Sequence, residues 1–459
     1  MLLDFFRNKK GLIISACILA ALLVSAALAF ITLNMKAFYR GISIDGVNVS
    51  GLKMEEAKAL IDWEVKNIFD SQKITLRYGN SAWVIYLSDI SMEYMTDEAL
   101  DEAYEAGRRG NVFYRLYSII KTRYEGAAYF SEISYDEEKL RNILLDIKKQ
   151  IDKNERSATV EYGNGNITIV KEEIGRILEV DENLKMLENN IERRNLQSMD
   201  LIVRENFPRV LYDDLKDIDG VIGAFSTAFS LQDYNRCYNI KLACEKINGT
   251  VILPGEMFSM NEALGPRTLD NGYREAPVIF KNELVKGTGG GVCQVTTTLY
   301  NAVLESKLQV CARTHHSMPL TYVDLGLDAT IAEDYIDFKF KNNTGFAVFV
   351  YACVEGNSVS IALLGNKDDT GLKVVLKSTV VEEYEPEGEE VIIDDSIPDN
   401  QRVVAREARK GYKAVVYRET YNKKGELTER EKISEDIYAP VKAQVKVNRN
   451  FSEDAGNIQ

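Results

Sequence analysis

Hydrophobic and polar positions divide this chain into an apolar N-terminal segment, a region of mixed periodicity and a strand-rich tail. From Gly11 to Leu33 there is no charged residue. A helix of that length reaches about 35 Å, enough to cross the hydrocarbon core of a bilayer. Slightly more basic residues precede the run than follow it, which favours a short N-terminus inside and the bulk of the chain outside. The pattern predicts a cytoplasmic stub over residues 1–10 and a transmembrane anchor over residues 11–33.

Two other interpretations of the apolar run remain open. A cleaved signal peptide usually has a shorter apolar segment followed by small residues, and residues 25–29 offer such a cleavage site. Residues 14–17 resemble a lipoprotein box, but few apolar residues precede Cys17 and many follow it. An uncleaved anchor fits the length of the run best.

The region 40–205 alternates short strands with amphipathic helices, which indicates an α+β fold. It contains no histidine and no cysteine, so it is a poor place for catalysis and serves either as a spacer or as a binding module. The expected strands lie at 42–47, 74–78, 83–87, 158–162 and 166–170, and the expected helices start near Glu55, Asp97, Ser134 and Asp181.

The segment 219–366 differs in composition from the region before it, because it holds both histidines of the chain and a dense run of glycines. We expect a second α+β domain there. An acidic stretch follows at 382–399, and alternating runs at 402–406, 413–420 and 443–447 then predict strands. The tail therefore reads as a small all-β module over residues 372–448, with a terminal extension over residues 449–459.

Charge and cysteine content narrow the possible functions. The net charge of −14 argues against a nucleic-acid surface. Five of the six cysteines lie outside the apolar run, and an odd, sparse set in an exported chain is not a disulfide framework. On one helix, Cys237 and Cys244 would lie about 10 Å apart, too far to bridge. At least one free thiol outside the membrane is expected.

The best candidate for chemistry is the segment Gly289-Gly290-Gly291-Val292-Cys293-Gln294. Apolar positions 295, 299, 302 and 303 share one face of a helix, and the glycines before them do not belong to it. Cys293 therefore lies in the first turn of a helix entered through a flexible loop. The helix dipole favours the thiolate there, and amides around Gly290, Gly291 and Gln294 could bind an oxyanion.

A partner for this thiol must come from His315 or His316, since these are the only two histidines. Asp324 and Asp328 are available to orient the ring, and Arg313 could hold a substrate carboxylate. The acid–base partners are thus expected immediately downstream of the cysteine helix.

Each element also has a simpler interpretation. The glycine–cysteine segment could be only a tight turn that the fold requires. A metal site needs three or four ligands at a recognisable spacing, and Cys293 with the two histidines is an unusual set, so no metal is predicted. A phosphate-binding loop needs a Lys-Ser or Lys-Thr pair after the glycines, which is absent. We expect no cofactor and no nucleotide.

Several ordered motifs resemble the VanW family over residues 219–366. They are Phe258-Ser259-Met260-Asn261, Gly265-Pro266-Arg267-Thr268, Gly272-Tyr273-Arg274-Glu275-Ala276-Pro277, the glycine–cysteine segment, Thr297-Thr298-Leu299-Tyr300-Asn301 and Asp328-Ala329-Thr330. The region 40–205, with its motif at 51–57, resembles a YoaR-like peptidoglycan-binding domain. The tail is similar to the five-glycine β module of cell-wall proteins, although most of those glycines are absent.

The resemblance implies a Gram-positive cell-wall protein acting on peptidoglycan stem peptides. Some VanW members are understood to be L,D-transpeptidases that use a cysteine, which would make Cys293 the nucleophile. His315 stands where the family often has proline, so His316 is the matching histidine, with Asp328 behind it. Substrate contacts would come from Arg313, Ser317, Thr297 and Tyr300. The alternative is a non-catalytic peptidoglycan-binding or vancomycin-resistance accessory protein.

Overall fold

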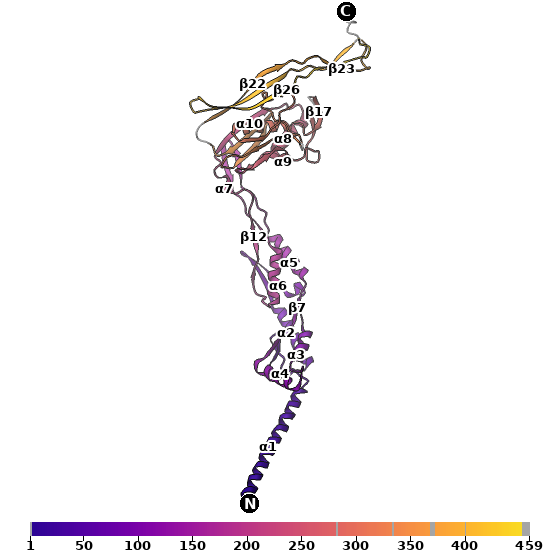
Figure 1. Cartoon of the computed structure of the whole chain (residues 1–459), viewed down its shortest axis with the longest axis vertical. Coiled ribbons are helices and arrows are strands. Elements are labelled where there is room, and N and C mark those ends of the chain that lie inside the picture. Colours follow the sequence, from indigo (N-terminus) through magenta and orange to yellow (C-terminus); the bar gives the residue numbers. More distant parts are fainter. Residues whose placement is uncertain (1, 281–282, 333–334, 368–371, 400, 452–459) are drawn as a thin grey trace, which may run out of the picture. The chain divides into compact units, whose positions relative to one another are not determined.

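The computed structural model describes residues 2–280, 283–332, 335–367, 372–399 and 401–451, and its backbone forms two compact units (Figure 1). The first unit comprises Met1–Asn154 and Ile174–Phe207. The second comprises Glu155–Glu173 and Pro208–Gln459. Each unit is described separately below.

The first unit begins with the helix α1 (Leu2–Leu33). Its segment Lys9–Leu33 is apolar and long enough to cross a membrane by length and composition, and none of it is buried inside the unit. The apolar helix expected from the sequence is therefore present.

The rest of the first unit is an α+β assembly with two hydrophobic cores, one around Phe38, Ile42 and Ile61 and one around Leu76, Leu144 and Leu187. Its remaining helices are α2 (Met54–Ser71), α3 (Thr96–Glu105), α4 (Val112–Glu125), α5 (Glu137–Ile151) and α6 (Val180–Glu192). Its strands are β1 (Ile42–Ile44), β2 (Val47–Asn48), β3 (Lys73–Tyr78), β4 (Ser81–Tyr86), β5 (Glu93–Met95), β6 (Ala127–Tyr129), β7 (Glu132–Ser134), β10 (Gly175–Leu178), β11 (Met199–Asp200) and β12 (Val203–Asn206).

The helix α4 is not among the helices expected from the sequence. Many of its residues are β-branched or aromatic, and these types favour strands over helices. Its boundaries are nevertheless encoded locally. The side chain of Asn111 accepts a hydrogen bond from the amide of Tyr114 at 2.9 Å, and Gly126 ends the helix with a φ of +78°.

The second unit is built on an antiparallel sheet with the strand order β13-β21-β20-β14. Side chains alternate between its two faces. The helices α8 and α10 cover the face that carries Val350 and Leu363, and the hairpin β8-β9 packs on the face that carries Phe349 and Leu364. The hairpin thus belongs to the second unit, although it comes from the region 40–205.

The elements of this unit outside the tail are the helices α7 (Tyr212–Leu215), α8 (Tyr234–Ile247), α9 (Met260–Leu264) and α10 (Val292–Glu305), with the strands β8 (Thr159–Gly163), β9 (Asn166–Val170), β13 (Gly220–Ala228), β14 (Val251–Ile252), β15 (Met257–Ser259), β16 (Glu275–Phe280), β17 (Glu283–Thr288), β18 (Gln309–Ala312), β19 (Lys339–Lys341), β20 (Val348–Glu355) and β21 (Ser358–Gly365). The helix α10 is the centre of the fold, because every residue from Gln294 to Leu304 is buried. Gly223 on β13 permits this close contact, since a Cβ atom there would lie 2.4 Å from the carbonyl oxygen of Ala302.

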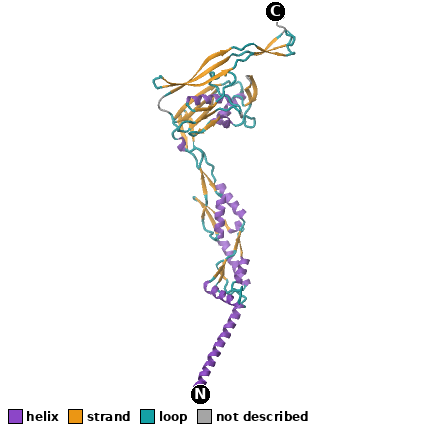
Figure 2. Cartoon of the chain, in the orientation of Figure 1, coloured by secondary structure: helices purple, strands orange, loops and turns teal. Residues whose placement is uncertain are grey.

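The tail, residues 372–451, consists of strands and loops (Figure 2). It forms two three-stranded sheets, β22-β25-β26 and β23-β27-β24, as expected for an all-β module, and we call it the tail module. Leu376, Val416 and Ile433 of the first sheet pack against the core that contains α10. Its strands are β22 (Lys373–Tyr384), β23 (Glu389–Ile393), β24 (Arg402–Arg406), β25 (Gly411–Tyr421), β26 (Leu427–Tyr438) and β27 (Ala443–Val447).

Candidate active site

The glycine run before α10 forms a tightly packed turn. Gly289 and Gly291 have φ values of +84° and +109°, which favour glycine. At Gly290 a Cβ atom would lie 2.5 Å from the carbonyl oxygen of Pro277 on β16. The prediction that this loop is flexible is therefore wrong. The glycines are needed because the turn packs tightly between β16 and α8.

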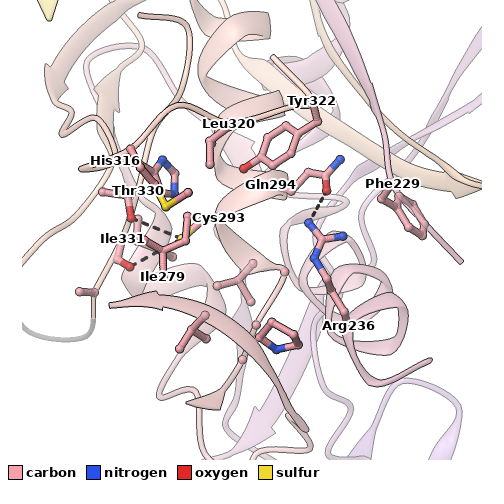
Figure 3. A pocket seen from close by; sticks show the side chains of 18 of the residues that line it. Phe229, Arg236, Ile279, Cys293, Gln294, His316, Leu320, Tyr322, Thr330 and Ile331 are labelled. Atoms are coloured by element: carbon pink, nitrogen blue, oxygen red, sulfur yellow. Dashed lines mark hydrogen bonds between the residues drawn. The ribbon is translucent and has the colours of Figure 1, made fainter. Parts of the chain in front are cut away.

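This turn delivers Cys293 to the first turn of α10, where its sulfur faces a cleft (Figure 3). The Sγ atom lies 3.5 Å from Oγ1 of Thr330 and 3.8 Å from the carbonyl oxygen of Ile331. The imidazole of His316 lies beside the sulfur (Figure 3) and acts on the pKa of the thiol. The cysteine predicted from the glycine pattern thus has an imidazole partner.

His316 is held by the carboxylate of Asp328. One carboxylate oxygen, Oδ2, lies 2.6 Å from Nδ1 of the ring and accepts a second hydrogen bond from the backbone amide of His316 at 2.6 Å. Both side chains are buried. Because the carboxylate fixes Nδ1 as the protonated nitrogen, Nε2 is the nitrogen available to the thiol. Cys293, His316 and Asp328 thus form a connected set of a thiol, an imidazole and a carboxylate, which we call the triad.

The electrostatics of the triad favour a charged thiolate. Burial raises the pKa of Cys293, but the hydrogen bond and positive charge of His316 outweigh it and lower the pKa to about 7. Burial lowers the pKa of His316, whereas Asp328 and Cys293 raise it, with a net value of about 9. Between these two values the pair exists as a thiolate and an imidazolium.

The tail module reaches this triad from β26. The hydroxyl of Tyr438 donates to Oδ1 of Asp328 at 2.5 Å and accepts from the backbone amide of Gly326 at 2.8 Å. Tyr438 is only 1 % exposed. Of the two oxygens of Asp328, Oδ2 therefore binds the histidine, whereas Oδ1 binds the tail module and lies 3.5 Å from Nη2 of Arg313.

Arg313 does not lie in the cleft, contrary to its predicted contact with a substrate carboxylate. Its Nη1 binds both oxygens of Asp436 on β26 at 2.8 and 2.7 Å, and its Nε donates to the carbonyl oxygen of Asp328 at 2.7 Å. Burial lowers its pKa, but Tyr300, Asp436 and Asp328 together raise it. This guanidinium joins the tail module to the loop that carries Asp328.

Thr297 and Tyr300 are also absent from the wall of the cleft. The hydroxyl of Thr297 bonds the backbone of Ala329, and the ring of Tyr300 packs against Phe338. Both predicted substrate contacts are therefore buried inside the fold, because α10 is surrounded on all sides by protein.

Of the other predicted residues, His315 and Ser317 line the cleft. Nδ1 of His315 lies 2.7 Å from the carbonyl oxygen of His316, and its ring packs edge-on against Tyr438 with centroids 5.0 Å apart. His316 is thus the histidine beside the thiol, as the family resemblance implied.

Gln294 has a different position from the one predicted for an oxyanion donor. Its backbone amide donates to the carbonyl oxygen of Gly291 at 3.0 Å, and its side-chain amide binds Thr227 and Ala228 on β13. Its side-chain oxygen accepts from Nη2 of Arg236 at 2.6 Å. Gln294 therefore orients Arg236 rather than offering a free donor.

The cleft has a volume of 1410 Å³ and extends from Cys293 to Arg236 (Figure 3). This volume exceeds that of typical small-molecule pockets and suits a peptide or another extended ligand. Among the described residues that line it, Arg236 and Arg267 are positively charged and Asp233 is negatively charged. The cleft is thus suited to a ligand that carries carboxylates.

Sequence reasoning missed Arg236, Arg267, Tyr322 and Thr330 as cleft residues. Signals existed for two of them, because Arg267 and Thr330 lie inside motifs that carried the family resemblance. Nothing near Arg236 in the sequence links it to Cys293, since the contact joins separate helices. In the part of the chain that the structure describes, no group of three or more His, Cys, Asp or Glu side chains could hold a metal ion.

Three family models match the chain in order. Residues 83–199 match a family of candidate peptidoglycan binding domains, residues 235–364 match "VanW like protein", and residues 377–449 match the G5 domain. The G5 domain of an IgA1 protease is a similar solved structure, at 18 % identity over 18 % of this chain and 96 % of that one, with a TM-score of 0.13.

Two curated proteins are similar in sequence. "Uncharacterized protein YoaR" of Bacillus subtilis is 39 % identical over 31 % of this chain, and "Vancomycin B-type resistance protein VanW" of Enterococcus faecalis is 26 % identical over 32 %. The chain spans about half the length of these relatives, 47 % and 55 %. The chain therefore contains, in order, regions that match a domain of the peptidoglycan-binding type, the VanW domain and the G5 domain.

Proposed function

We propose that this protein is a cysteine acyltransferase of the L,D-transpeptidase type, which cross-links the stem peptides of peptidoglycan. The observation that carries the proposal is the triad Cys293–His316–Asp328 in the wall of a cleft large enough for a peptide. A low thiol pKa beside an oriented imidazole is what covalent acyl transfer needs. The match to a family of candidate peptidoglycan binding domains supports a cell-wall polymer as the substrate class.

In the first half-reaction, the thiolate of Cys293 attacks the carbonyl carbon of the third residue of a donor stem. The imidazolium of His316 gives its proton to the nitrogen of the fourth residue as the peptide bond breaks. D-alanine leaves and a thioester remains on the sulfur. Asp328 keeps the ring in the tautomer that this proton transfer requires.

In the second half-reaction, the amine of a neighbouring stem attacks the thioester. His316, now neutral, takes a proton from this amine while the carbon–sulfur bond breaks. The products are a new amide cross-link and the thiolate, which pairs again with the imidazolium. No oxidant and no external energy source are required, because one amide bond is exchanged for another.

Two further groups support this chemistry. The amides of Gly290, Gly291 and Cys293 lie at the N-terminal end of α10, where backbone N–H groups and the helix dipole stabilise a developing oxyanion. Arg236, held by Gln294, takes the role that the sequence assigned to Arg313 and binds a carboxylate of the stem.

The same proposal places the protein at the cell surface. The helix α1 anchors the chain in the membrane, and the domains after it face the wall. The domain of the peptidoglycan-binding type and the G5 domain then hold the polymer near the cleft.

The test uses the full-length protein with purified muropeptides that carry tetrapeptide stems, analysed by mass spectrometry. The wild type should release D-alanine and form cross-linked dimers, whereas Cys293→Ala should form none. Cys311→Ala, the same substitution at an exposed thiol, is the matched control and should retain activity. If the wild type forms neither dimers nor amino-acid exchange products, the proposed activity is wrong.

A second candidate function is non-catalytic binding to the wall, favoured by the two flanking domain matches. It predicts that wild type and Cys293→Ala sediment equally with insoluble peptidoglycan and that neither alters it. Product formation by the wild type excludes binding as the sole function.

A further inference from the structure

The helix α4 in the first unit exposes a continuous stripe of large apolar side chains. Phe113, Tyr117, Ile120 and Tyr124 recur at a spacing that puts them on one face, and they are 83, 62, 56 and 84 % exposed. The opposite face packs Ile119 into the core. A soluble surface rarely leaves so many large apolar groups together uncovered, so this face requires a partner.

The position of α4 indicates which partner it has. The guanidinium of Arg115 in α4 donates to the carbonyl oxygen of Leu33, the last residue of α1, at 2.7 Å. Arg108, just before α4, donates to the carbonyl oxygens of Met35 and Ala37 at 3.0 and 2.7 Å. These bonds fix α4 beside the end of α1 within this unit (Figure 1). If α1 crosses a bilayer, α4 lies where α1 leaves it.

The composition of α4 also fits a lipid surface. Tyrosine is enriched at membrane interfaces because its ring is apolar and its hydroxyl is polar. Residues 107–125 contain five basic side chains and one acidic side chain, although the whole chain has a net charge of −14. A basic segment is attracted to anionic headgroups, and an apolar helix face inserts between them.

We propose that α4 lies in the interface of the bilayer that α1 crosses, with the stripe Phe113, Tyr117, Ile120 and Tyr124 inserted among the lipids. The domain at the end of the anchor then rests on the membrane. This inference is independent of the chemistry at Cys293.

The experiment measures quenching of an introduced tryptophan by brominated lipids. The full-length protein is reconstituted in vesicles of phosphatidylglycerol and phosphatidylethanolamine, and Tyr117→Trp is compared with the parent, which carries Trp63 and Trp83. The added emission should fall by about half in brominated vesicles, because an interfacial helix buries its apolar face at the headgroup boundary. Lys185→Trp, at an exposed position of α6, is the control and should not be quenched.

Tyr124→Trp provides a second probe at a side chain that is almost fully exposed, in case the first variant folds poorly. If neither introduced tryptophan is quenched, the lipid partner is wrong. A blue-shifted emission without quenching would mean that protein, such as a second copy of the chain, covers the stripe.

A second, independent observation concerns Tyr438. The matched VanW region ends at residue 364 and the G5 match starts at residue 377, yet the hydroxyl of Tyr438 binds the carboxylate of the triad. We infer that Tyr438 is a positioning residue, through which the G5 domain completes the active site; this rests on the proposed function. Removing its hydroxyl would leave Oδ1 of Asp328 with the ion pair to Nη2 of Arg313, at 3.5 Å, and would loosen the orientation of His316.

The charged and titratable groups around this contact come from the loop after β18 and from β26. His316, His315 and Arg313 belong to the loop after β18, Asp436 faces Arg313 from β26, and Tyr322 lies near the sulfur. None of them is altered in Tyr438→Phe, so the substitution removes one hydrogen-bond donor and one acceptor and leaves the charges in place.

The test is the pH profile of Cys293 alkylation by iodoacetamide in the full-length protein. In Tyr438→Phe the midpoint should rise by about one pH unit, with an alkylation rate about fivefold lower at pH 7. Tyr421→Phe is the matched control, because its hydroxyl binds Glu419 within the same module. Its profile should equal that of the wild type.

The two failures are distinguishable. A wild-type Cys293 that resists alkylation at pH 7 contradicts the proposed function. If the wild-type thiol is reactive and the folded Tyr438→Phe variant has the same midpoint, only the role of Tyr438 is contradicted. A circular-dichroism melt of each variant establishes that it is folded.

Discussion

Two cysteines pack in the same hydrophobic core, and the pKa values of their thiols shift in opposite directions. Cys244, on α8, is buried among apolar side chains, and burial with the nearby Cys353 and Glu245 raises its pKa to about 12. Cys293, at the start of α10, is also affected by burial, yet its pKa falls to about 7 because His316 is beside it. Burial in the core therefore raises the pKa of a thiol and makes it unreactive, and a neighbouring imidazole reverses this shift in pKa.

The largest expected effect is the difference in reactivity between these two thiols. At pH 7 about half of Cys293 is thiolate, whereas Cys244 is almost entirely protonated. Iodoacetamide should modify Cys293 more than about 10³ times faster. Peptide mass spectrometry after timed alkylation measures both rates, with the exposed Cys311 as an internal reference. Equal labelling of the two would contradict the comparison.

Removing the imidazole should make Cys293 resemble Cys244. In His316→Gln, burial remains and the positive charge is lost, so the pKa of Cys293 should rise above its ordinary value of 9.0. The alkylation rate at pH 7 should fall about 100-fold, which corresponds to two pKa units. His315→Gln, at the neighbouring ring, should change the rate by less than about twofold.

Asp328→Asn tests the orienting carboxylate and should have a smaller effect. Without the carboxylate, the pKa of His316 falls, because Asp328 is among the groups that raise it. A less stable imidazolium stabilises the thiolate less, so the pKa of Cys293 rises. We expect an alkylation rate about tenfold lower at pH 7. A rate equal to that of the wild type would show that the thiolate does not depend on Asp328.

The smallest effect is expected at the inert thiol. Cys244→Ser buries a hydroxyl in an apolar core, which should cost about 1 kcal/mol in the free energy of unfolding. The alkylation profile of Cys293 should not change. Chemical denaturation and the same alkylation assay measure the two quantities. A change in Cys293 reactivity would mean that the two regions are coupled.

The cysteine and its helix could be predicted from local pattern. The glycines exclude a helix before Val292, and the apolar spacing from Val295 starts one. The same spacing also led to a wrong prediction, because it indicates one buried face whereas α10 is buried on all sides. Thr297 and Tyr300 therefore looked available to substrate although they are part of the core.

Other features depend on contacts that no local pattern contains. Arg313 follows a strand near two histidines, as a substrate-binding arginine could, but its partner Asp436 lies in another domain. The bond between Tyr438 and Asp328 likewise joins two domains. The helix α4 was missed for a different reason: it is rich in β-branched and aromatic residues, which favour strands over helices.

The order of these residues along the chain has a consequence for biosynthesis. Cys293 and His316 are made long before β26, whose Tyr438 lies near the C-terminal end. During synthesis, the partly made chain lacks the strand that holds Asp328. Full activation of the thiol therefore follows the folding of the tail module, and the nascent chain carries a less reactive cysteine while it is still unfolded.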